Sequence, residues 1–361
     1  MFKLKDQIRK LYTSSILGNL SLTGAWVAIL SARGFSLVEI GFAETIFHAV
    51  SITFELPSGI LADVFGRKKM LLISTIMTMI ANAIMIFSND LATVCLSVAF
   101  NALGYNFASG SGDALAYDSM KLVKAEGGFD KYESDQLIIY RVCDGISTLC
   151  AGFALTIGHR LAYGVDIVIC AVQLAVLYTL HEVTLGDVPQ GSVAQRLKDC
   201  VKKSLLFLKD ARKAMGLMLC NSLVGALDIL LLFFLQAKLP ERGIPEWALG
   251  PALLFMSLGG VVGSKLILKL TKPKYKTVFA ATAALVMLGI LAEHSQLYLI
   301  MAAGGFLAAV GDDALQVRTN VKLQNMFPSE QRATLTSVES LSFSLIMIVL
   351  SPLAGFFFTY W

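Results

Sequence analysis

Residues 55–71 read ELPSGILADVFGRKKML, a short charged stretch between two long apolar segments. The stretch contains a carboxylate at Asp63 and three consecutive bases beginning at Arg67. The flanking segments each approach or exceed about 20 residues, the length that an α-helix needs to cross a hydrocarbon core. The pattern predicts two membrane-spanning helices joined by a charged loop at the membrane surface.

The composition is that of a membrane protein. The chain has 361 residues, of which 56% are hydrophobic and 16% are charged, and its mean hydropathy is +0.68. Soluble domains carry about 25% charged residues. Apolar segments of about 20 residues recur along the whole chain. We therefore predict an all-α polytopic membrane protein.

Several function classes lack their sequence signatures. The chain has no HExxH, G-x-S-x-G or P-loop motif, so we predict neither an enzyme nor a self-contained ATP-driven pump. The six cysteines are scattered and form no C-x-x-C pair, which argues against a disulfide framework or a metal site. We expect no cofactor and no bound metal. The net charge of +4 reflects basic loops at a membrane surface and does not indicate nucleic-acid binding.

Hydropathy and helix breakers predict eleven spans, six before a long polar loop and five after it. The domains are then an N-terminal bundle at 1–182, a linker with a basic amphipathic helix at 183–212, and a C-terminal bundle at 213–361. We expect the absence of a twelfth span to reflect truncation of the chain. The predicted spans are 12–32, 38–62, 69–88, 91–119, 134–158, 160–181, 213–237, 246–270, 275–292, 296–323 and 331–360.

Basic residues gather in alternate loops, and this asymmetry predicts the orientation. The side that holds the basic N-terminus also holds Arg67 to Lys69, Lys121 to Lys131 and Arg196 to Lys213. Loops on that side are expected to be cytoplasmic by the positive-inside rule. We therefore expect a cytoplasmic N-terminus, with the bases of the first loop on the anionic inner leaflet.

The two halves share a short repeat. GDALAYDSMKL occupies 112–122 and DDALQVRTNVKL occupies 312–323, so the triplet Asp-Ala-Leu that begins at Asp113 recurs at Asp313. The repeat falls in the fourth and tenth predicted spans, at corresponding places on either side of the linker. This arrangement indicates a duplicated bundle.

The opening stretch now resembles a known signature. GILADVFGRKK at 59–69 is similar to the loop between the second and third spans of the major facilitator superfamily, roughly G-x-L-A-D-x-x-G-R-K/R. MFPSEQRATLTSVESL at 326–341 resembles the segment that enters the eleventh span of bacterial members. The resemblance implies two pseudo-symmetric six-helix bundles, here without the twelfth span. It also implies a secondary transporter that works by alternating access in a bacterial cytoplasmic membrane, and we expect a monomer.

Residues in and near the signature are expected to form a gating latch. Asp63 lies at the negative end of the second helix dipole and Arg332 at the positive end of the eleventh, so each charge is unfavourable alone. The resemblance implies that these two helix ends meet, with Asp118 nearby. We expect Gly59 to allow close helix approach and Gly66 to end the second helix. The predicted latch comprises Gly59, Asp63, Gly66, Arg67, Asp118 and Arg332.

Carboxylates outnumber bases within the spans. Ionisable groups at membrane depth are costly and usually line a polar cavity. Their excess predicts proton coupling, with a cationic or amphiphilic substrate as a second hypothesis. Arg141 and Arg318 are the expected charge partners, and Arg141 would pair with Asp144 one helical turn later. The proton-coupling candidates are Glu55, Asp113, Asp144, Asp228, Asp312, Asp313 and Glu339.

The resemblance also implies that the first, fourth, seventh and tenth spans line a pore. The fourth span, NALGYNFASGSGDALAYDS at 101–119, resembles a set of bacterial members regarded as exporters and lacks the arginine of drug/proton antiporters. We expect proton-coupled efflux of a small organic molecule. Proton-symport uptake of a nutrient is the alternative, and a non-transporting sensor or scaffold is a third hypothesis. The candidate pore residues are Asn19, Thr23, Tyr105, Asn106 and Asn221, together with Asp228 and Asp312.

Overall fold

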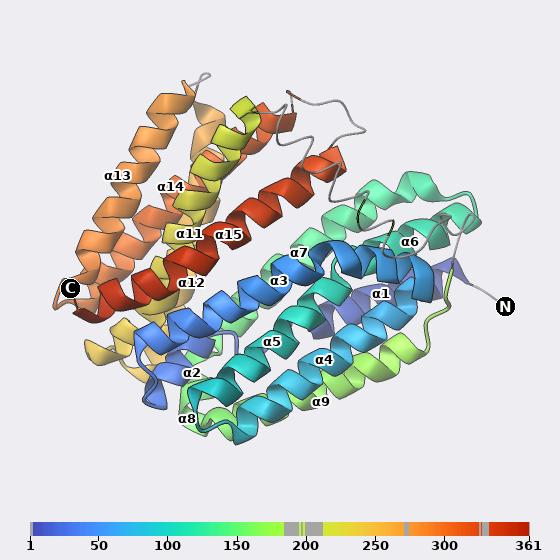
Figure 1. Cartoon of the computed structure of the whole chain (residues 1–361), viewed down its shortest axis with the longest axis horizontal. Coiled ribbons are helices and arrows are strands. Elements are labelled where there is room, and N and C mark those ends of the chain that lie inside the picture. Colours follow the sequence, from blue (N-terminus) through green and yellow to red (C-terminus); the bar gives the residue numbers. More distant parts are fainter. Residues whose placement is uncertain are drawn as a thin grey trace. The chain divides into compact units, whose positions relative to one another are not determined.

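The computed structural model in Figure 1 describes residues 3–183, 195, 198, 212–270, 274–324, 326 and 332–360. Every regular element within these residues is helical, and the predicted all-α class is confirmed. The predicted amphipathic helix of the linker lies almost entirely outside the described residues. The helices before the linker are α1 (Leu4–Asn19), α2 (Trp26–Ala32), α3 (Leu37–Phe65), α4 (Arg67–Phe87), α5 (Leu91–Ala108), α6 (Ser111–Leu122), the 3₁₀ turn η1 (Glu126–Gly128), α7 (Phe129–Leu149), α8 (Ala151–Ile157) and α9 (His159–Tyr178). The helices after it are α11 (Arg212–Glu241), α12 (Glu246–Lys269), α13 (Tyr275–Glu293), α14 (Tyr298–Gln324) and α15 (Arg332–Tyr360).

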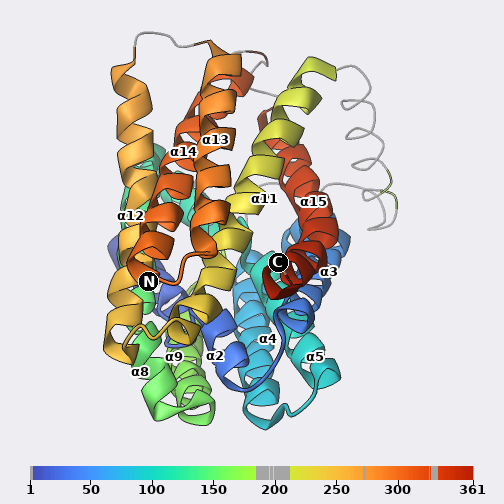
Figure 2. The ribbon, with the colours of Figure 1, turned by 90° about the vertical axis from the view of Figure 1, so that its left-hand side faces the viewer.

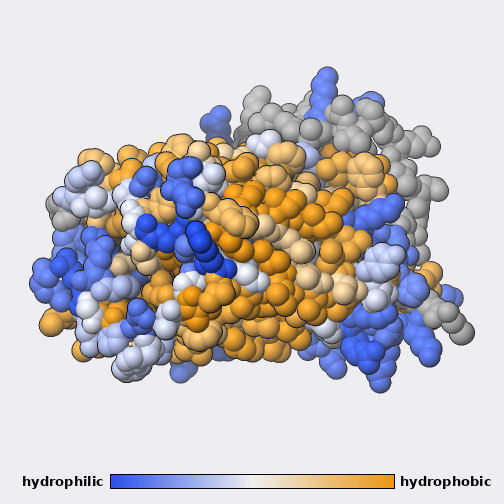
Figure 3. All heavy atoms as spheres, turned by 90° about the horizontal axis from the view of Figure 1, so that it is seen from below, coloured by the Kyte–Doolittle hydropathy of each residue, from blue (hydrophilic) through white to orange (hydrophobic). Residues whose placement is uncertain are grey.

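Membrane-spanning helices dominate the chain. Nine helices among the described residues are long and apolar enough to cross a bilayer. A tenth candidate is the pair formed by α7 and α8, which is bent by 45°. In the face shown in Figure 3, apolar side chains cover the middle and hydrophilic ones gather mainly toward the two ends. Such a surface suits a protein whose middle contacts lipid.

Internal contacts group the chain into two compact units, which cut across three of the predicted spans. The predicted domain boundaries at 182 and 213 stay a prediction, because two segments of the N-terminal half, Ala25–Thr45 and Thr148–Thr156, group with the second unit. The first unit comprises Met1–Gly24, Ile46–Ser147 and Ile157–Val201, and the second comprises Ala25–Thr45, Thr148–Thr156 and Lys202–Trp361.

Three predicted spans are interrupted. The first was expected to be one helix over 12–32, but α1 ends at Asn19 and α2 begins at Trp26. The fourth is interrupted between α5 and α6 at Gly110, whose φ of +67° is readily adopted by glycine. The fifth bends between α7 and α8. Hydropathy misses such breaks because the apolar run continues through them.

A compact apolar cluster closes one end of the first unit. Leu115 and Leu177 are fully buried there, and Tyr132 is 1% exposed. The ring of Tyr12 stacks on that of Tyr132 with the ring centroids 5.2 Å apart. The cluster joins α1, α6, α7 and α9 at the end that also carries the charged loop. The cluster therefore supports the segment that carries the bases Arg67 to Lys69.

The second unit is built around α14. Figure 2 shows α12, α13 and α14 side by side, and both α12 and α13 pack along α14. Small residues permit the contact: a Cβ atom at Gly263 of α12 would lie 2.8 Å from the carbonyl carbon of Val310, closer than non-bonded carbon atoms approach. Small residues at helix interfaces let backbones come together in membranes. The position of α14 is thereby fixed against α12.

Candidate functional site

A polar face runs along α11 in the second unit. Asn221, Gly225 and Asp228 are spaced by four and three residues, so all three lie on one side of the helix. Asn221 is 8% exposed and Asp228 is 4% exposed. The Oδ1 atom of each has no hydrogen-bond partner among the described residues. Buried acceptors are nearly always paired, so this face can still accept bonds from a donor.

The helix α14 supplies two more carboxylates. Adjacent residues of a helix point about 100° apart, and Asp312 and Asp313 diverge accordingly. Oδ1 of Asp312 lies 3.4 Å from the position that a Cβ atom at Gly225 would take, so this carboxylate faces α11. The carboxylate of Asp313 lies against Gly260 of α12. The two glycines leave the room that the carboxylates occupy.

We call Asn221, Asp228, Asp312 and Asp313 the acidic site. An ionised carboxylate costs much free energy away from water, and a second like charge nearby adds to that cost. A bound proton or a cationic ligand relieves both costs. The arrangement can therefore take up and release a proton, or exchange a proton for a cation.

The other predicted proton-coupling carboxylates lie on four different helices. Glu55 on α3 and Glu339 on α15 are partly buried. Asp113 on α6 and Asp144 on α7 are exposed. The sequence does not distinguish these four residues from the acidic site. In the structure, exposure sets Asp113 and Asp144 apart, while Glu55 and Glu339 are partly buried like the two carboxylates of α14 but lie on other helices.

The predicted pair between Arg141 and Asp144 stays a prediction. In this structure no ion pair joins the two side chains, both of which lie in the described part of the chain and are exposed. The guanidinium of Arg141 lies instead 5.8 Å from the ring centroid of Tyr140. Exposed ion pairs contribute little free energy, so a nearby aromatic ring competes with them effectively. The second expected partner, Arg318, lies partly buried on α14.

One buried carboxylate of the first unit was missed from the sequence. Asp166 of α9 is 3% exposed and accepts bonds from the gap between α1 and α2. The donors are the Ser21 hydroxyl (2.8 Å), the Leu22 amide (2.7 Å) and the Thr23 hydroxyl (2.6 Å) and amide (3.2 Å). These bonds replace those that the interrupted helix lacks. The polar run NLSLTG at 19–24 was the available signal, but it does not identify its partner.

The predicted pore residues differ in how they are bonded. Thr23 is bonded to Asp166, and the Asn19 amide donates to the Ser15 carbonyl at 2.8 Å. Asn106 is 1% exposed and donates to the Ala102 carbonyl, whereas Tyr105 is 61% exposed. Asn221 belongs to the acidic site. A role in substrate contact stays a prediction for all five.

In the first unit, Arg67 turns inward. Its guanidinium forms an ion pair with Asp118 and donates to the Ala114 carbonyl at 2.8 Å. Asp118 is only 8% exposed. The prediction that Arg67 rests on lipid is therefore wrong, because the carboxylate and carbonyl of α6 offer it stronger, less hydrated partners. Arg67 and Asp118, both assigned to the predicted latch, thus pair with each other, a contact that was not predicted.

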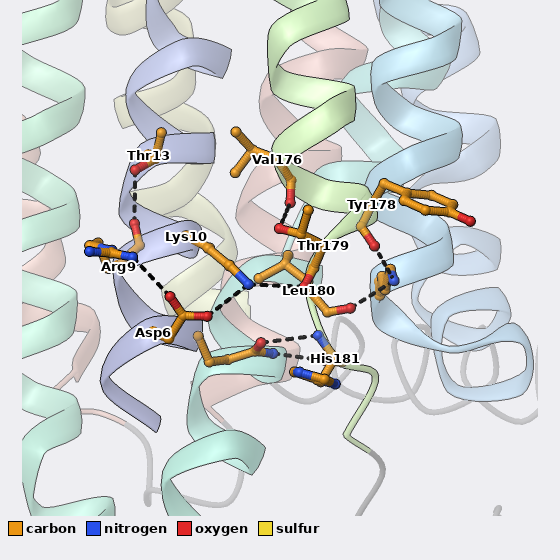
Figure 4. Close-up of polar contacts among 11 residues, drawn as sticks. Asp6, Arg9, Lys10, Thr13, Val176, Tyr178, Thr179, Leu180 and His181 are labelled. Atoms are coloured by element: carbon orange, nitrogen blue, oxygen red, sulfur yellow. Dashed lines mark hydrogen bonds and ion pairs between the residues drawn. The ribbon is translucent and has the colours of Figure 1, made fainter. Parts of the chain in front are cut away.

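Basic side chains also close the end of α9. Figure 4 shows the Lys10 ammonium between Asp6 and the Thr179 carbonyl, which lie 2.7 Å and 3.2 Å away. Lys68 donates to the carbonyls of Tyr178 and Leu180, at 2.7 Å each. The last carbonyls of a helix lack partners within it, and cations there are favourable. Lys68 thus caps α9, and its predicted place on the lipid surface is wrong.

Gly66 and Glu182 form the start of α4. Gly66 follows the last residue of α3, Phe65, as predicted, with φ +98° and ψ 145°. A Cβ atom there would lie 2.6 Å from Oε2 of Glu182. This close approach lets the Glu182 carboxylate accept the amides of Arg67 and Lys68 at 3.0 Å each. An anion at a helix N-terminus satisfies free N–H groups and the helix dipole.

Replacing Glu182 with alanine is expected to lower the stability of the purified protein by about 1 kcal/mol, because two amides of α4 lose their acceptor. The thermal unfolding midpoint in detergent would report the change. Glu126→Ala is the control, since this exposed glutamate at η1 has no hydrogen bond among the described side chains. Equal midpoints for the two variants would contradict the capping role.

Three latch positions remain. A Cβ atom at Gly59 would meet no described atom within 4 Å, so the predicted close helix approach at Gly59 is wrong for the part of the chain described. Asp63 is partly buried near the end of α3, as expected. The side chain of Arg332 lies outside the described residues. The latch between these helix ends stays a prediction.

Comparison with known sequences identifies the family. A model of the Major Facilitator Superfamily matches residues 11–292. An uncharacterized MFS-type transporter of Bacillus subtilis (strain 168), YxaM, is 21% identical over 323 residues, which cover 87% of this chain and 79% of the relative. The match spans both halves of the chain.

Solved structures show the same fold. A structure of the nucleoside transporter NupG, solved as a point mutant, has a TM-score of 0.76 and 14% identity, and covers 96% of this chain and 90% of its own. A bacterial homologue of the human lysosomal transporter Spinster has a TM-score of 0.70 and 15% identity, and the match covers 97% of this chain and 80% of the homologue. A D-xylose–proton symporter has a TM-score of 0.67 and 13% identity, and the match covers 96% of this chain and 88% of the symporter. At these identities the likeness establishes the fold alone, and it confirms the predicted fold.

Proposed function

This chain belongs to the Major Facilitator Superfamily of membrane transporters and is not an enzyme, and we propose that it exchanges protons for a small organic cation. The direction is export, by alternating access. The proposal places the protein as a monomer in a bacterial cytoplasmic membrane with its N-terminus inside, as the basic loops predict.

The acidic site carries this proposal. Asp228 is almost fully buried and has an unpaired Oδ1 atom, and Asn221 offers a second unpaired acceptor on the same helix face. Asp312 faces the same helix at Gly225, one turn before Asp228. A site with several acceptors and like charges favours a ligand that brings donors and positive charge. A proton and an organic cation meet this requirement in turn, which supports antiport.

Symport is the second candidate. A D-xylose–proton symporter has the same fold, and a carboxylate group that binds protons serves symport equally well. In that case a neutral substrate would bind after the proton and not in place of it. The sign of the pH gradient that drives accumulation distinguishes the two mechanisms.

The test uses the full chain in proteoliposomes with the membrane potential clamped. The probes are ethidium as a permanent organic cation, and uridine and D-xylose as neutral compounds. Antiport predicts ethidium accumulation only when the lumen is acidic, because protons leave as the cation enters. Symport predicts accumulation of a neutral probe only when the outside is acidic. Protein-free liposomes give the background.

Two results would count against the proposal. Uptake of a probe that is independent of both gradient directions would exclude proton coupling for that substrate. Accumulation of a neutral probe with an acidic exterior would replace antiport with symport and leave the acidic site as the proton site.

A further inference from the structure

The chain passes between the two units inside three helical spans. It leaves the first unit after Gly24, enters it again within α3 after Thr45, and leaves it once more after Ser147. Two of these crossing points coincide with broken helices. The first lies at the gap between α1 and α2, and the second beside the bend between α7 and α8.

On the first-unit side, the two breaks are tied together. The Ser147 hydroxyl oxygen accepts the Ser21 amide at 3.0 Å. The Cβ atom of Ser147 lies 3.5 Å from the position that a Cβ atom at Gly24 would take, which is ordinary van der Waals contact. Asp166 holds the next two amides, as described above. Residues 21–24 are therefore fixed to α7 and α9.

On the second-unit side, the short helices that follow the breaks are held by other partners. The ring of Trp26, the first residue of α2, meets the ring of Phe233 of α11 edge-on, with the centroids 5.9 Å apart. In α8, Gly152 packs against the backbone of Glu246. Thr156 donates to the Glu246 carboxylate at 2.8 Å. Both α2 and α8 thus pack within the second unit.

We infer that the two breaks form one paired hinge and that Asp166 is the positioning residue that fixes its first-unit side. The gap after α1 lacks the i to i−4 bonds that keep a helix straight. In an apolar environment its amides must still be bonded. The hydrogen bonds of Asp166 go to residues 21–23 and not to α2, so α2 can change its angle while residues 21–23 stay bonded. This inference requires only a transporter with two conformations, and it holds whether or not protons are coupled.

Distances between spin labels test the hinge in the full chain, in nanodiscs and in a background without native cysteines. One pair joins Thr13 of α1 to Ala32 of α2, both of which are exposed. The control pair joins Thr13 to the exposed Tyr178 within the first unit. We expect two distances for the hinge pair and one for the control pair. If the distance distribution of the hinge pair is as narrow as that of the control pair, the first span is rigid and the inference is overturned.

Hydrogen exchange tests the role of Asp166. Asp166→Asn keeps the size of the side chain but leaves one acceptor oxygen, so exchange at residues 20–25 is expected to rise about tenfold or more. The hinge-pair distances should broaden with it. Gln173→Leu is the matched control, because Gln173 also joins α9 to α1, at Ser14 and beside Gly18, but bonds none of residues 21–23. It should leave exchange at 20–25 unchanged.

A milder variant decides the matter if Asp166→Asn does not fold. Ser147→Ala removes one acceptor and should accelerate exchange at Ser21. Equal acceleration at 20–25 in the Gln173 variant would show that general packing of α1 on α9 is responsible. That result would overturn the role of Asp166, as would unchanged exchange in both the Asp166 and Ser147 variants.

Discussion

Asp228→Asn is expected to abolish accumulation driven by a pH gradient, while the carboxylates of Asp312 and Asp313 still bind the cation and allow it to equilibrate. One pH unit supplies about 1.4 kcal/mol for each proton, so a gradient of two units supports about 100-fold accumulation at one proton per substrate. Asparagine has nearly the same shape but cannot gain or lose the proton. The ratio should therefore fall from about 100 toward 1. Probe accumulation in proteoliposomes measures it, with exchange of labelled for unlabelled probe as the test of intact binding.

The control is a carboxylate that stays ionised throughout the assay. Asp90 caps α5 outside the spans, and the Thr93 amide that it accepts at 2.8 Å lowers the pKa of its carboxyl below the usual value. At assay pH values above that range Asp90 carries no exchangeable proton. Asp90→Asn keeps the cap, since asparagine is an equally good N-cap residue. Its accumulation ratio should match that of the unchanged protein.

The variant Asp312→Asn tests whether the acidic site binds protons as a group or whether Asp228 binds them alone. Asp312 faces Gly225 one turn from Asp228, so the two carboxylates share one electrostatic environment and are expected to titrate together. Loss of coupling in either variant fits the proposal. Full accumulation in both single variants and in the double variant would show that protons bind elsewhere.

The long apolar helices could be predicted from the sequence. The predicted spans 69–88, 246–270 and 275–292 end within two residues of α4, α12 and α13. Length and hydropathy suffice there because a membrane requires a continuous apolar helix of about 20 residues. Within the signature loop only the end of the helix at Gly66 could be predicted, since a glycine that ends a helix follows from a local rule.

The breaks and their partners could not be predicted in this way. The gap after α1 is stable because Asp166, 143 residues from Thr23 in the chain, supplies its missing acceptors. The pairing of Arg67 with Asp118 likewise depends on the fold. Periodicity and hydropathy describe a helix by its own residues. They carry no information about which distant side chain completes it.

Gly263→Leu is expected to prevent stable folding of the second unit. In α12, Gly259 and Gly263 lie one turn apart and face the carbonyls of Phe306 and Val310 on α14. At Gly263 even a Cβ atom would lie 2.8 Å from the Val310 carbonyl carbon and closer to its oxygen. Backbone cannot rotate away as a flexible side chain can. A leucine therefore forces the two helices apart along their whole contact.

The smaller substitution gives a graded result. Gly263→Ala gains about 1 kcal/mol of helix propensity over glycine, whereas overpacking a tight contact costs about 1–3 kcal/mol. Because a Cβ atom here overlaps a backbone carbonyl, we expect the overpacking cost to lie at the upper end of that range and to exceed the gain in helix propensity. The thermal unfolding midpoint in detergent should therefore fall. Gly216→Ala in α11 is the control, because a Cβ atom there meets no described atom within 4 Å. Its midpoint should stay the same or rise.

The same contact bears on transport, because it positions the acidic site. Gly260, next to Gly259 in α12, faces the carboxylate of Asp313. Helices separated by an alanine at Gly263 should also move Asp313 away from α12. Gly263→Ala is then expected to lower the accumulation ratio as well as the midpoint, while Gly216→Ala lowers neither. A Gly263→Leu protein with an unchanged midpoint would mean that α12 and α14 do not approach this closely.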